Sequence, residues 1–311
     1  MPKPDSRIYV SGHTGMVGIT LVEKLRSAGY RNLLLAPHSE LELRDQVQTF
    51  DWFEKNRPEI VVHAAAKVGG IEANRTHMGE FLYDNLVMAC NVFEASRRVG
   101  AAKVLFIASS CMYPRDCPQP MREEDLMTGP LEPTNEGYAI AKIAGMKLAQ
   151  TYTAQYGMNC VTAVPCNLYG PNDDFDPVNS HVLSALVRKF VTARDANEPS
   201  VTMWGTGVAR RELMHVADVA SAIVLLMDMY DSSDAINVGP GDDISISELA
   251  NLVSEAAGYR GEINWDPSKP DGMPRKLMDS SGMRALGWTP HVTLKEGVKE
   301  MVALYEKGNH G

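Results

Sequence analysis

Three evenly spaced glycines restrict the fold more than any other feature of this sequence. A short apolar run at residues 8–10 leads directly into Gly12, Gly15 and Gly18, and an amphipathic stretch then continues to Gly29. Such a strand–turn–helix unit gathers free backbone N–H groups at the positive end of a helix dipole, where glycine lets a pyrophosphate come close. A tight turn without a ligand is the plainer alternative, but the place after the first strand favours a dinucleotide site.

Alternating strand-like and helix-like segments predict the rest of the first half. Strand-like runs lie at 33–36, 59–66, 103–110 and 159–170, with helical patterns between them. This alternation predicts a Rossmann-type, doubly wound parallel sheet of the α/β class. The regular alternation of strand-like and helix-like segments ends after residue 170. We therefore expect a dinucleotide-binding domain at 1–170, with a returning segment near 213–240. A smaller α/β substrate lobe is expected from 171–212 and 241–311.

The end of the second strand bears on the choice of dinucleotide. Enzymes that use NAD commonly place an acidic residue there to hold the ribose 2′-hydroxyl. This strand ends in residues 35–39, which contain neither a carboxylate nor a Lys or Arg for a 2′-phosphate. The missing acid favours NADP, with His38 and Ser39 as phosphate partners. The predicted cofactor-binding residues are Gly12, His13, Thr14, Gly15, Met16, Val17, Gly18, His38, Ser39, Ala65, Lys142, Pro165, Asn167, Leu168 and His181.

Composition narrows the class of protein. The formal net charge of -9 argues against a general binder of nucleic acid or anionic membrane, because both need a basic surface. No apolar run reaches the roughly 20 residues of a membrane span, and the polar first residues carry no secretory signal. The five cysteines are scattered without metal-ligand spacing, so we expect a reduced, cytoplasmic protein without a metal site.

Tyr138 and Lys142 stand four residues apart in a helical stretch, which places them on one helix face. An ammonium near a phenol lowers the tyrosine pKa, so the pair could exchange a proton with a carbonyl or an alcohol near neutral pH. A surface pair on an ordinary helix is the plainer alternative. The glycine turn and the serines at the end of the fourth strand favour a catalytic pair.

Three further side chains are candidates for the reaction. Ser109 or Ser110 lies at the carboxyl end of a strand, where parallel sheets bind ligands. Cys111 follows directly, either as a small buried side chain or as a thiolate base beside a ketone. His181 begins a later helix, either as a cap or surface group or as the matching acid.

Several segments resemble the GDP-L-fucose synthase family, a branch of the extended short-chain dehydrogenases/reductases. The resemblance runs from residue 8 to the last helix, and its most specific segments are SSCMYP, EPTNEGYAIAKIAG and NLYGPNDDFDPVNSHV. Further similar segments are AAAKVGGI, WGTG and SKPDGMPRK. The resemblance implies an NADPH-dependent enzyme that epimerises GDP-4-keto-6-deoxy-D-mannose at C3 and C5 and then reduces C4.

Roles for individual residues follow from the resemblance. It implies that Ser109 polarises the C4 carbonyl, Tyr138 donates its proton, and Lys142 tunes Tyr138 and holds the nicotinamide ribose. Cys111 would be the epimerisation base and His181 the acid. The residues that would hold GDP are Lys189, Trp204, Arg211 and Asp271. The resemblance also implies a homodimer formed through a helix face.

Two departures from the family pattern stand out. Bacterial relatives often carry arginines in the glycine turn and after the second strand, whereas this chain has Thr14 and Ala36. Cys166 and Asn167 occupy a segment that reads Thr-Asn in other members. Two alternatives stay open: an enzyme for another GDP-4-keto-deoxy-sugar, of the colitose or deoxy-heptose type, and a non-catalytic NADP-binding sensor.

Overall fold

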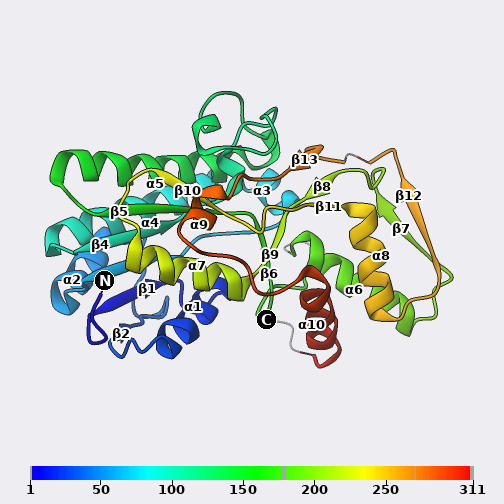
Figure 1. Ribbon diagram of the computed structural model, residues 1–311, viewed down its shortest axis with the longest axis horizontal. Coiled ribbons are helices and arrows are strands. Elements are labelled where there is room, and N and C mark those ends of the chain that lie inside the picture. The colour runs from blue at the N-terminus through cyan, green and yellow to red at the C-terminus, as the bar shows by residue number, and fades with distance from the viewer. Residues whose placement is uncertain (1, 177–179, 270, 309–311) are drawn as a thin grey trace.

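The computed structural model describes residues 2–176, 180–269 and 271–308. Its centre is a six-stranded sheet in which each neighbouring pair is parallel (Figure 1). In spatial order the strands are β10 (Ala235–Val238), β5 (Cys160–Pro165), β4 (Lys103–Ile107), β3 (Ile60–His63), β1 (Ile8–Ser11) and β2 (Leu33–Leu34). All residues of the inner strands are buried, as expected for a parallel sheet covered on both faces.

Helices cover both faces of this sheet. On one face α4 and α5 pack side by side, with α2 against α4, and on the other face α1 packs against α7 (Figure 1). The predicted doubly wound parallel sheet is therefore confirmed. The helix bounds are α1 (Met16–Ser27), α2 (Gln46–Asn56), α3 (Ile71–Thr76), α4 (Met78–Val99), α5 (Glu136–Tyr156) and α7 (Val216–Met229).

The strand order creates a crevice at the carboxyl ends of the strands. β1 pairs with β2 on one side and with β3 on the other, so the chain crosses over β1 between these two neighbours. At such a reversal of strand order the connections leave the carboxyl ends of the strands in opposite directions, and ligands bind between them. The glycine turn follows β1 and Ala65 follows β3, so both flank this crevice.

A second hydrophobic cluster lies at the other end of the molecule. The three helices α6, α8 and α10 pack on one another there, beside a parallel pair formed by β7 and β12 (Figure 1). The short strand β8 pairs antiparallel with β11 and parallel with β13. The bounds are α6 (Val182–Asp195), β7 (Ser200–Trp204), β8 (Arg210–Arg211), β11 (Ile244–Ser245), α8 (Ile246–Ala257), β12 (Glu262–Asp266), β13 (Arg275–Lys276), α9 (Ser281–Ala285) and α10 (Leu294–Glu306).

One sequence-based expectation about the strands is wrong. Residues 159–170 do not form one strand, because β5 ends at Pro165 and β6 (Asn167–Tyr169) pairs instead with β9 (Leu213–His215). Between them the N–H of Cys166 donates to the carbonyl of Val238, so the chain turns from one partner strand to another. Helix α8 begins with a capping box, in which Ser245 and Glu248 make reciprocal bonds.

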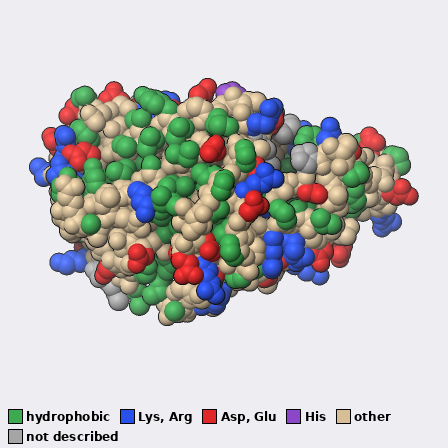
Figure 2. All heavy atoms as spheres, turned by 90° about the horizontal axis from the view of Figure 1, so that it is seen from above, with side chains coloured by type: hydrophobic (Ala, Val, Ile, Leu, Met, Phe, Trp, Pro, Cys, Tyr) green, Lys and Arg blue, Asp and Glu red, His purple; other side chains and the backbone are tan. Residues whose placement is uncertain are grey.

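The surface carries charges of both signs. On the face drawn in Figure 2, acidic and basic side chains are interspersed, and hydrophobic side chains are most frequent over the larger half of the molecule. Within the described residues, no helix has both the length and the apolar character needed to cross a bilayer.

Candidate active site

The glycine turn is pressed against the loop that follows β3. Gly12 has a φ of 70°, and a Cβ atom there would lie 2.7 Å from the backbone of Ala65. The Ser11 hydroxyl accepts the N–H of Ala65 at 3.1 Å, which fixes the distance between the two loops. Any residue larger than glycine at position 12 would collide with the backbone of Ala65 and push these loops apart.

The start of α1 offers donors to an anion. Its N-cap residue, Gly15, supplies no capping side chain, and the first turn contains no acidic residue. Beside it the buried Nδ1 atom of His13 has no hydrogen-bond partner. Burial lowers the pKa of His13, and nearby Glu40 opposes this shift. Free helix N–H groups and an unpartnered polar atom in a glycine cradle fit the pyrophosphate of a dinucleotide.

His38 and Ser39, predicted to read a 2′-phosphate, are both exposed after β2. The His38 imidazole lies 2.7 Å from the carboxylate of Glu42, which also pairs with Arg44. The His38 side chain is 77% accessible. Pro165, Asn167 and Leu168 lie where the chain passes from β5 to β6.

Helix α5 is held close to β4 by one glycine. A Cβ atom on Gly145 would lie 2.4 Å from the ring of Phe106, so only glycine permits this approach. As a result the Lys142 ammonium reaches the carbonyl of Ile107, the last residue of β4, at 2.8 Å. Lys142 lies 4.9 Å from the Phe106 ring centroid and 5.6 Å from that of Tyr138. Tyr138 and Lys142 thus share one helix face at the carboxyl end of the sheet.

The expectation of a lowered tyrosine pKa is wrong for this structure. Burial raises the pKa of Tyr138 above its usual range, and a negative charge on the neighbouring Cys111 thiolate raises it further. Lys142 does not offset this, because its ammonium donates to a backbone carbonyl and lies over the ring rather than at the phenol oxygen. Burial instead lowers the pKa of Lys142 to about 8. The phenol is therefore held neutral, as a proton donor must be.

Ser109 and Cys111 lie in the turn directly after β4. The Ser109 hydroxyl accepts the N–H of Cys111 at 3.3 Å and caps a short 3₁₀ turn, Ser110–Met112. Cys111 is 6% exposed. Burial raises the pKa of its thiol, whereas Lys276, the Ser109 side chain and Lys142 favour the thiolate. Neighbouring ammonium groups favour a thiolate, but burial is the larger effect here, so the pKa of Cys111 is raised overall.

His181 is the N-cap residue of α6. Its Nδ1 atom lies 3.2 Å from a carboxylate oxygen of Asp173, which is 3% exposed. The bond to Asp173 raises the pKa of His181, and burial opposes the shift. In the described part of the chain, no hydrogen bond or ion pair joins His181 to Cys111.

Three of the four residues predicted to bind GDP gather around one loop. Asp271 accepts both the N–H and the hydroxyl of Thr206 at 2.7 Å, which ties it to the turn after Trp204. Arg211 points to the same turn region and donates to the carbonyl of Met273 at 2.6 Å. Trp204 is 69% exposed. Lys189 instead donates to the carbonyl of Thr202, on the strand that leads to Trp204.

Two residues of the site escaped the interpretation of the sequence. Lys276 is brought beside Arg211 by the pairing of β13 with β8, and it lies close to Cys111. Asp173 was covered only as part of a motif. Both stand in segments that carry the family resemblance, SKPDGMPRK and NLYGPNDDFDPVNSHV. The sequence offered one signal for each: Lys276 lies in the same segment as Asp271, and Asp173 lies in the same segment as His181.

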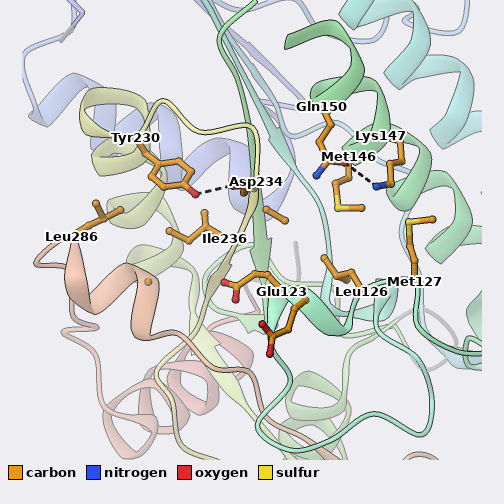
Figure 3. Close-up of a pocket in the computed structure, with 13 residues that line it drawn as sticks. Glu123, Leu126, Met127, Met146, Lys147, Gln150, Tyr230, Asp234, Ile236 and Leu286 are labelled. Carbon is orange, nitrogen blue, oxygen red and sulfur yellow. Dashed lines mark hydrogen bonds between the residues drawn. The ribbon is translucent and has the colours of Figure 1, made fainter. Parts of the chain in front are cut away.

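A large surface hollow lies elsewhere and does not belong to this site. It measures about 510 Å³ and lies at the β10 edge of the sheet, between α5 and α9 (Figure 3). Figure 3 shows the carboxylate of Glu123 and the ring of Tyr230 at its rim. Glu123 there accepts the N–H of Asn237 at 2.8 Å, which protects the open edge of β10. None of the predicted catalytic or cofactor-binding residues lines this hollow.

Comparison with known proteins gives consistent similarities. The model of the NAD dependent epimerase/dehydratase family matches residues 8–239. The chain is 47% identical to GDP-L-fucose synthase 1 of Arabidopsis thaliana, over 99% of this chain and 95% of that protein. It is 43% identical to the GDP-L-fucose synthase of Escherichia coli, over 94% of both. Among solved structures, MlghC, a GDP-mannoheptose C4 reductase from Campylobacter jejuni with NADP bound, superposes with a TM-score of 0.91 at 34% identity, covering 98% of this chain and 100% of that one.

The glycine turn yields a matched pair of variants. At Gly15 a Cβ atom would meet only the Gly12 carbonyl oxygen, at an ordinary 3.6 Å, whereas at Gly18 it would lie 2.0 Å from that oxygen. We expect Gly15→Ala to fold normally but to bind dinucleotide about tenfold or more weakly, because its methyl group occupies the pyrophosphate path. Gly18→Ala should lower the free energy of unfolding by about 1–3 kcal/mol.

Urea unfolding of the protein without cofactor and titration of its fluorescence with NADPH measure the two effects. Equal loss of stability in both variants, with unchanged dinucleotide affinity in Gly15→Ala, would show that the turn does not receive the pyrophosphate.

Proposed function

We propose that this chain, which belongs to the NAD dependent epimerase/dehydratase family, acts as a GDP-L-fucose synthase. It would epimerise GDP-4-keto-6-deoxy-D-mannose at C3 and C5 and then reduce C4 to give GDP-L-fucose. Relatives named GDP-L-fucose synthase are 43–47% identical over nearly the whole chain. The observation that carries the proposal is that Ser109, Cys111, Tyr138 and Lys142 come together where the turn after β4 meets α5.

The cofactor is NADPH, which supplies the hydride for C4. The turn at Gly12 to Gly18, the unpartnered Nδ1 of His13 and Ala65 would hold its pyrophosphate side. We assign its 2′-phosphate to His38 and Ser39, and to Thr14 at the turn, because these polar groups are exposed where the arginines of bacterial relatives are missing. Lys142 would hold the nicotinamide ribose, and the segment Pro165, Asn167 and Leu168 would line the nicotinamide end together with His181.

Epimerisation needs a base and an acid on opposite faces of the sugar. The C4 ketone acidifies the hydrogens on both C3 and C5, so a single base can serve both carbons. The Cys111 thiolate would remove the proton, favoured by the ammonium groups of Lys276 and Lys142. His181, whose pKa is raised by its bond to Asp173, would return a proton from the other face.

Reduction then requires a proton for the C4 oxygen. Tyr138, kept neutral by burial, would donate this proton while the Ser109 hydroxyl polarises the carbonyl. The Lys142 ammonium, which lies over the Tyr138 ring, would stabilise by its charge the phenolate that forms once Tyr138 has reacted.

The GDP portion would bind in the smaller lobe. We assign the diphosphate to Arg211 and Lys189 and a packing surface for the nucleotide to the exposed ring of Trp204. Asp271 would hold the loop through Thr206 and face the nucleotide. This assignment matches the division of the chain into a dinucleotide domain, 1–170 with a returning segment, and a substrate lobe, a division that stays a prediction.

NMR analysis of the product tests this function. With GDP-4-keto-6-deoxy-D-mannose and NADPH we expect GDP-L-fucose, and with NADH a slower reaction to the same product. A product reduced at C4 but unchanged at C3 and C5 would contradict the epimerase part. No oxidation of NADPH with any keto-sugar would instead favour the sensor.

A second candidate is a reductase for a GDP-linked heptose or a colitose-type sugar. It is favoured by the similarity to the GDP-mannoheptose C4 reductase, with a TM-score of 0.91. Parallel reactions with GDP-4-keto-6-deoxy-D-mannose and a GDP-4-keto-heptose separate the two candidates through their relative kcat/KM values.

Two variants separate the two halves of the reaction. Cys111→Ser should abolish exchange of solvent deuterium into C3 and C5 while sparing part of the C4 reduction, because a hydroxyl is too weak an acid to act as the base. Tyr138→Phe should lower C4 reduction by about 10²-fold or more while leaving exchange and NADPH affinity intact. Mass spectrometry of recovered sugar and NADPH absorbance measure the two steps, and wild-type exchange in Cys111→Ser would remove this residue from the base role.

We also propose a homodimer in the cytoplasm. The packed pair of helices α4 and α5 exposes large apolar side chains, which a second copy of the pair would cover. These side chains are Met78, Tyr83, Ile140 and Tyr156. The cytoplasmic location is supported by the five cysteines, all of which have free thiols.

Sedimentation velocity tests the dimer. Tyr83 on α4 is 63% exposed, and Val47 on α2 is 67% exposed. Tyr83→Glu should convert the dimer to a monomer because it buries a charge in the interface, whereas Val47→Glu should leave the sedimentation coefficient unchanged. A monomeric wild-type protein, or a dimer that survives the Tyr83 change, would refute this interface.

A further inference from the structure

Asp173 is a buried carboxylate that makes contacts with three different residues, one of which is His181. It lies in the turn after β6, is 3% exposed, and its Oδ1 atom receives the N–H of Asp174 at 3.0 Å. The same oxygen lies 3.2 Å from Nδ1 of His181, and its second oxygen accepts the hydroxyl of Ser184. Ser184 stands within the first turn of α6, the helix that His181 caps. The carboxylate therefore ties the turn and the helix start together.

This contact fixes which nitrogen of His181 carries a proton. A carboxylate only accepts, so Nδ1 must be the donor in the bond to Asp173. Nε2 is then the nitrogen left to exchange a proton with a ligand, and 42% of the His181 side chain is exposed. The same division of roles, one ring nitrogen on an orienting carboxylate and the other in reaction, defines the histidine of hydrolytic triads.

The carboxylate also offsets an unfavourable position. The positive end of the α6 dipole, where His181 stands, disfavours a protonated imidazole. The charged groups that face His181 are Asp173 and, more weakly, Asp174, both from the turn. Without Asp173, helix dipole and burial would both push the ring toward its neutral form. The bond to Asp173 reverses this, and the pKa of His181 is raised.

We propose that Asp173 is the positioning residue of the epimerisation acid, holding the His181 proton on Nδ1 and keeping Nε2 charged for donation to the sugar. This inference rests on the proposed function. At each carbon, the Cys111 sulfur takes the proton as the C–H bond breaks and an enolate forms. The Nε2–H bond then breaks as a new C–H bond forms on the other face. The ring is left neutral with its proton on Nδ1, and exchange with solvent returns both groups to their starting states.

Two variants of the same turn test the inference. Asp173→Asn retains an oxygen that can accept from Nδ1 but removes the charge, so we expect the His181 pKa to fall by about one unit or more. The alkaline loss of deuterium exchange at C3 and C5 should then begin at a pH lower by the same amount. Asp174→Asn removes an equal charge, without a hydrogen bond to His181, and should shift both midpoints much less.

NMR titration of the histidine Cε1–H signals, with His181→Gln for assignment, measures the first midpoint without any turnover. NADPH affinity and thermal unfolding, measured alongside, show whether each variant keeps its fold. If Asp173→Asn does not fold, Ser184→Ala serves instead. It frees one carboxylate oxygen and should raise the His181 midpoint, because a carboxylate with one donor fewer attracts the imidazolium more strongly.

An unchanged His181 midpoint in a folded Asp173→Asn protein, or equal shifts in Asp173→Asn and Asp174→Asn, would overturn the inference. A wild-type protein that shows no exchange at C3 or C5 would refute the proposed function. It would leave the link between Asp173 and His181 to be decided by the NMR titration, which needs no turnover. A shifted midpoint with an unshifted exchange profile would show that His181 is held by Asp173 but is not the acid.

Discussion

The hydrogen bond from the Lys142 ammonium to the carbonyl of Ile107 sets the geometry of the whole site. It joins the middle of α5 to the last residue of β4, with a length of 2.8 Å in a buried setting. Because Gly145 lets the helix lie directly on Phe106, this bond forms without displacing the strand. Tyr138, one turn earlier on α5, then necessarily stands beside the turn that carries Ser109 and Cys111.

Burial and charge together shift the pKa of each of these groups. Tyr138 stays neutral, because burial raises its pKa and a Cys111 thiolate raises it further. Burial lowers the pKa of Lys142 to about 8, so its ammonium can exchange a proton near neutral pH. Cys111 receives opposing influences, burial against the ammonium groups of Lys276 and Lys142. Groups of unlike pKa in one site are the usual arrangement for acid and base steps that follow one another.

Local patterns in the sequence were sufficient for the sheet, the glycine turn and the shared helix face of Tyr138 and Lys142, since each depends on residues close in the chain. They failed where a distant partner decides. The run 159–170 is apolar enough for one long strand. It is divided because Cys166 bonds to Val238, whereas the residues after it pair with β9. The Tyr138 pKa was predicted in the wrong direction, because burial of the phenol raises it and the Lys142 ammonium is bonded to the Ile107 carbonyl instead.

The sequence by itself therefore determined the order of strands and helices, the cradle for a dinucleotide and the chemical types in the site, because periodicity, turn geometry and helix spacing act over a few residues. Only the tertiary structure decided which charges meet. It brought Lys276 to Cys111 through the pairing of β13 with β8, and Asp173 to His181 across the turn that precedes α6. Electrostatic interactions depend on the distance between groups and on their burial, and the spacing of residues along the chain determines neither quantity.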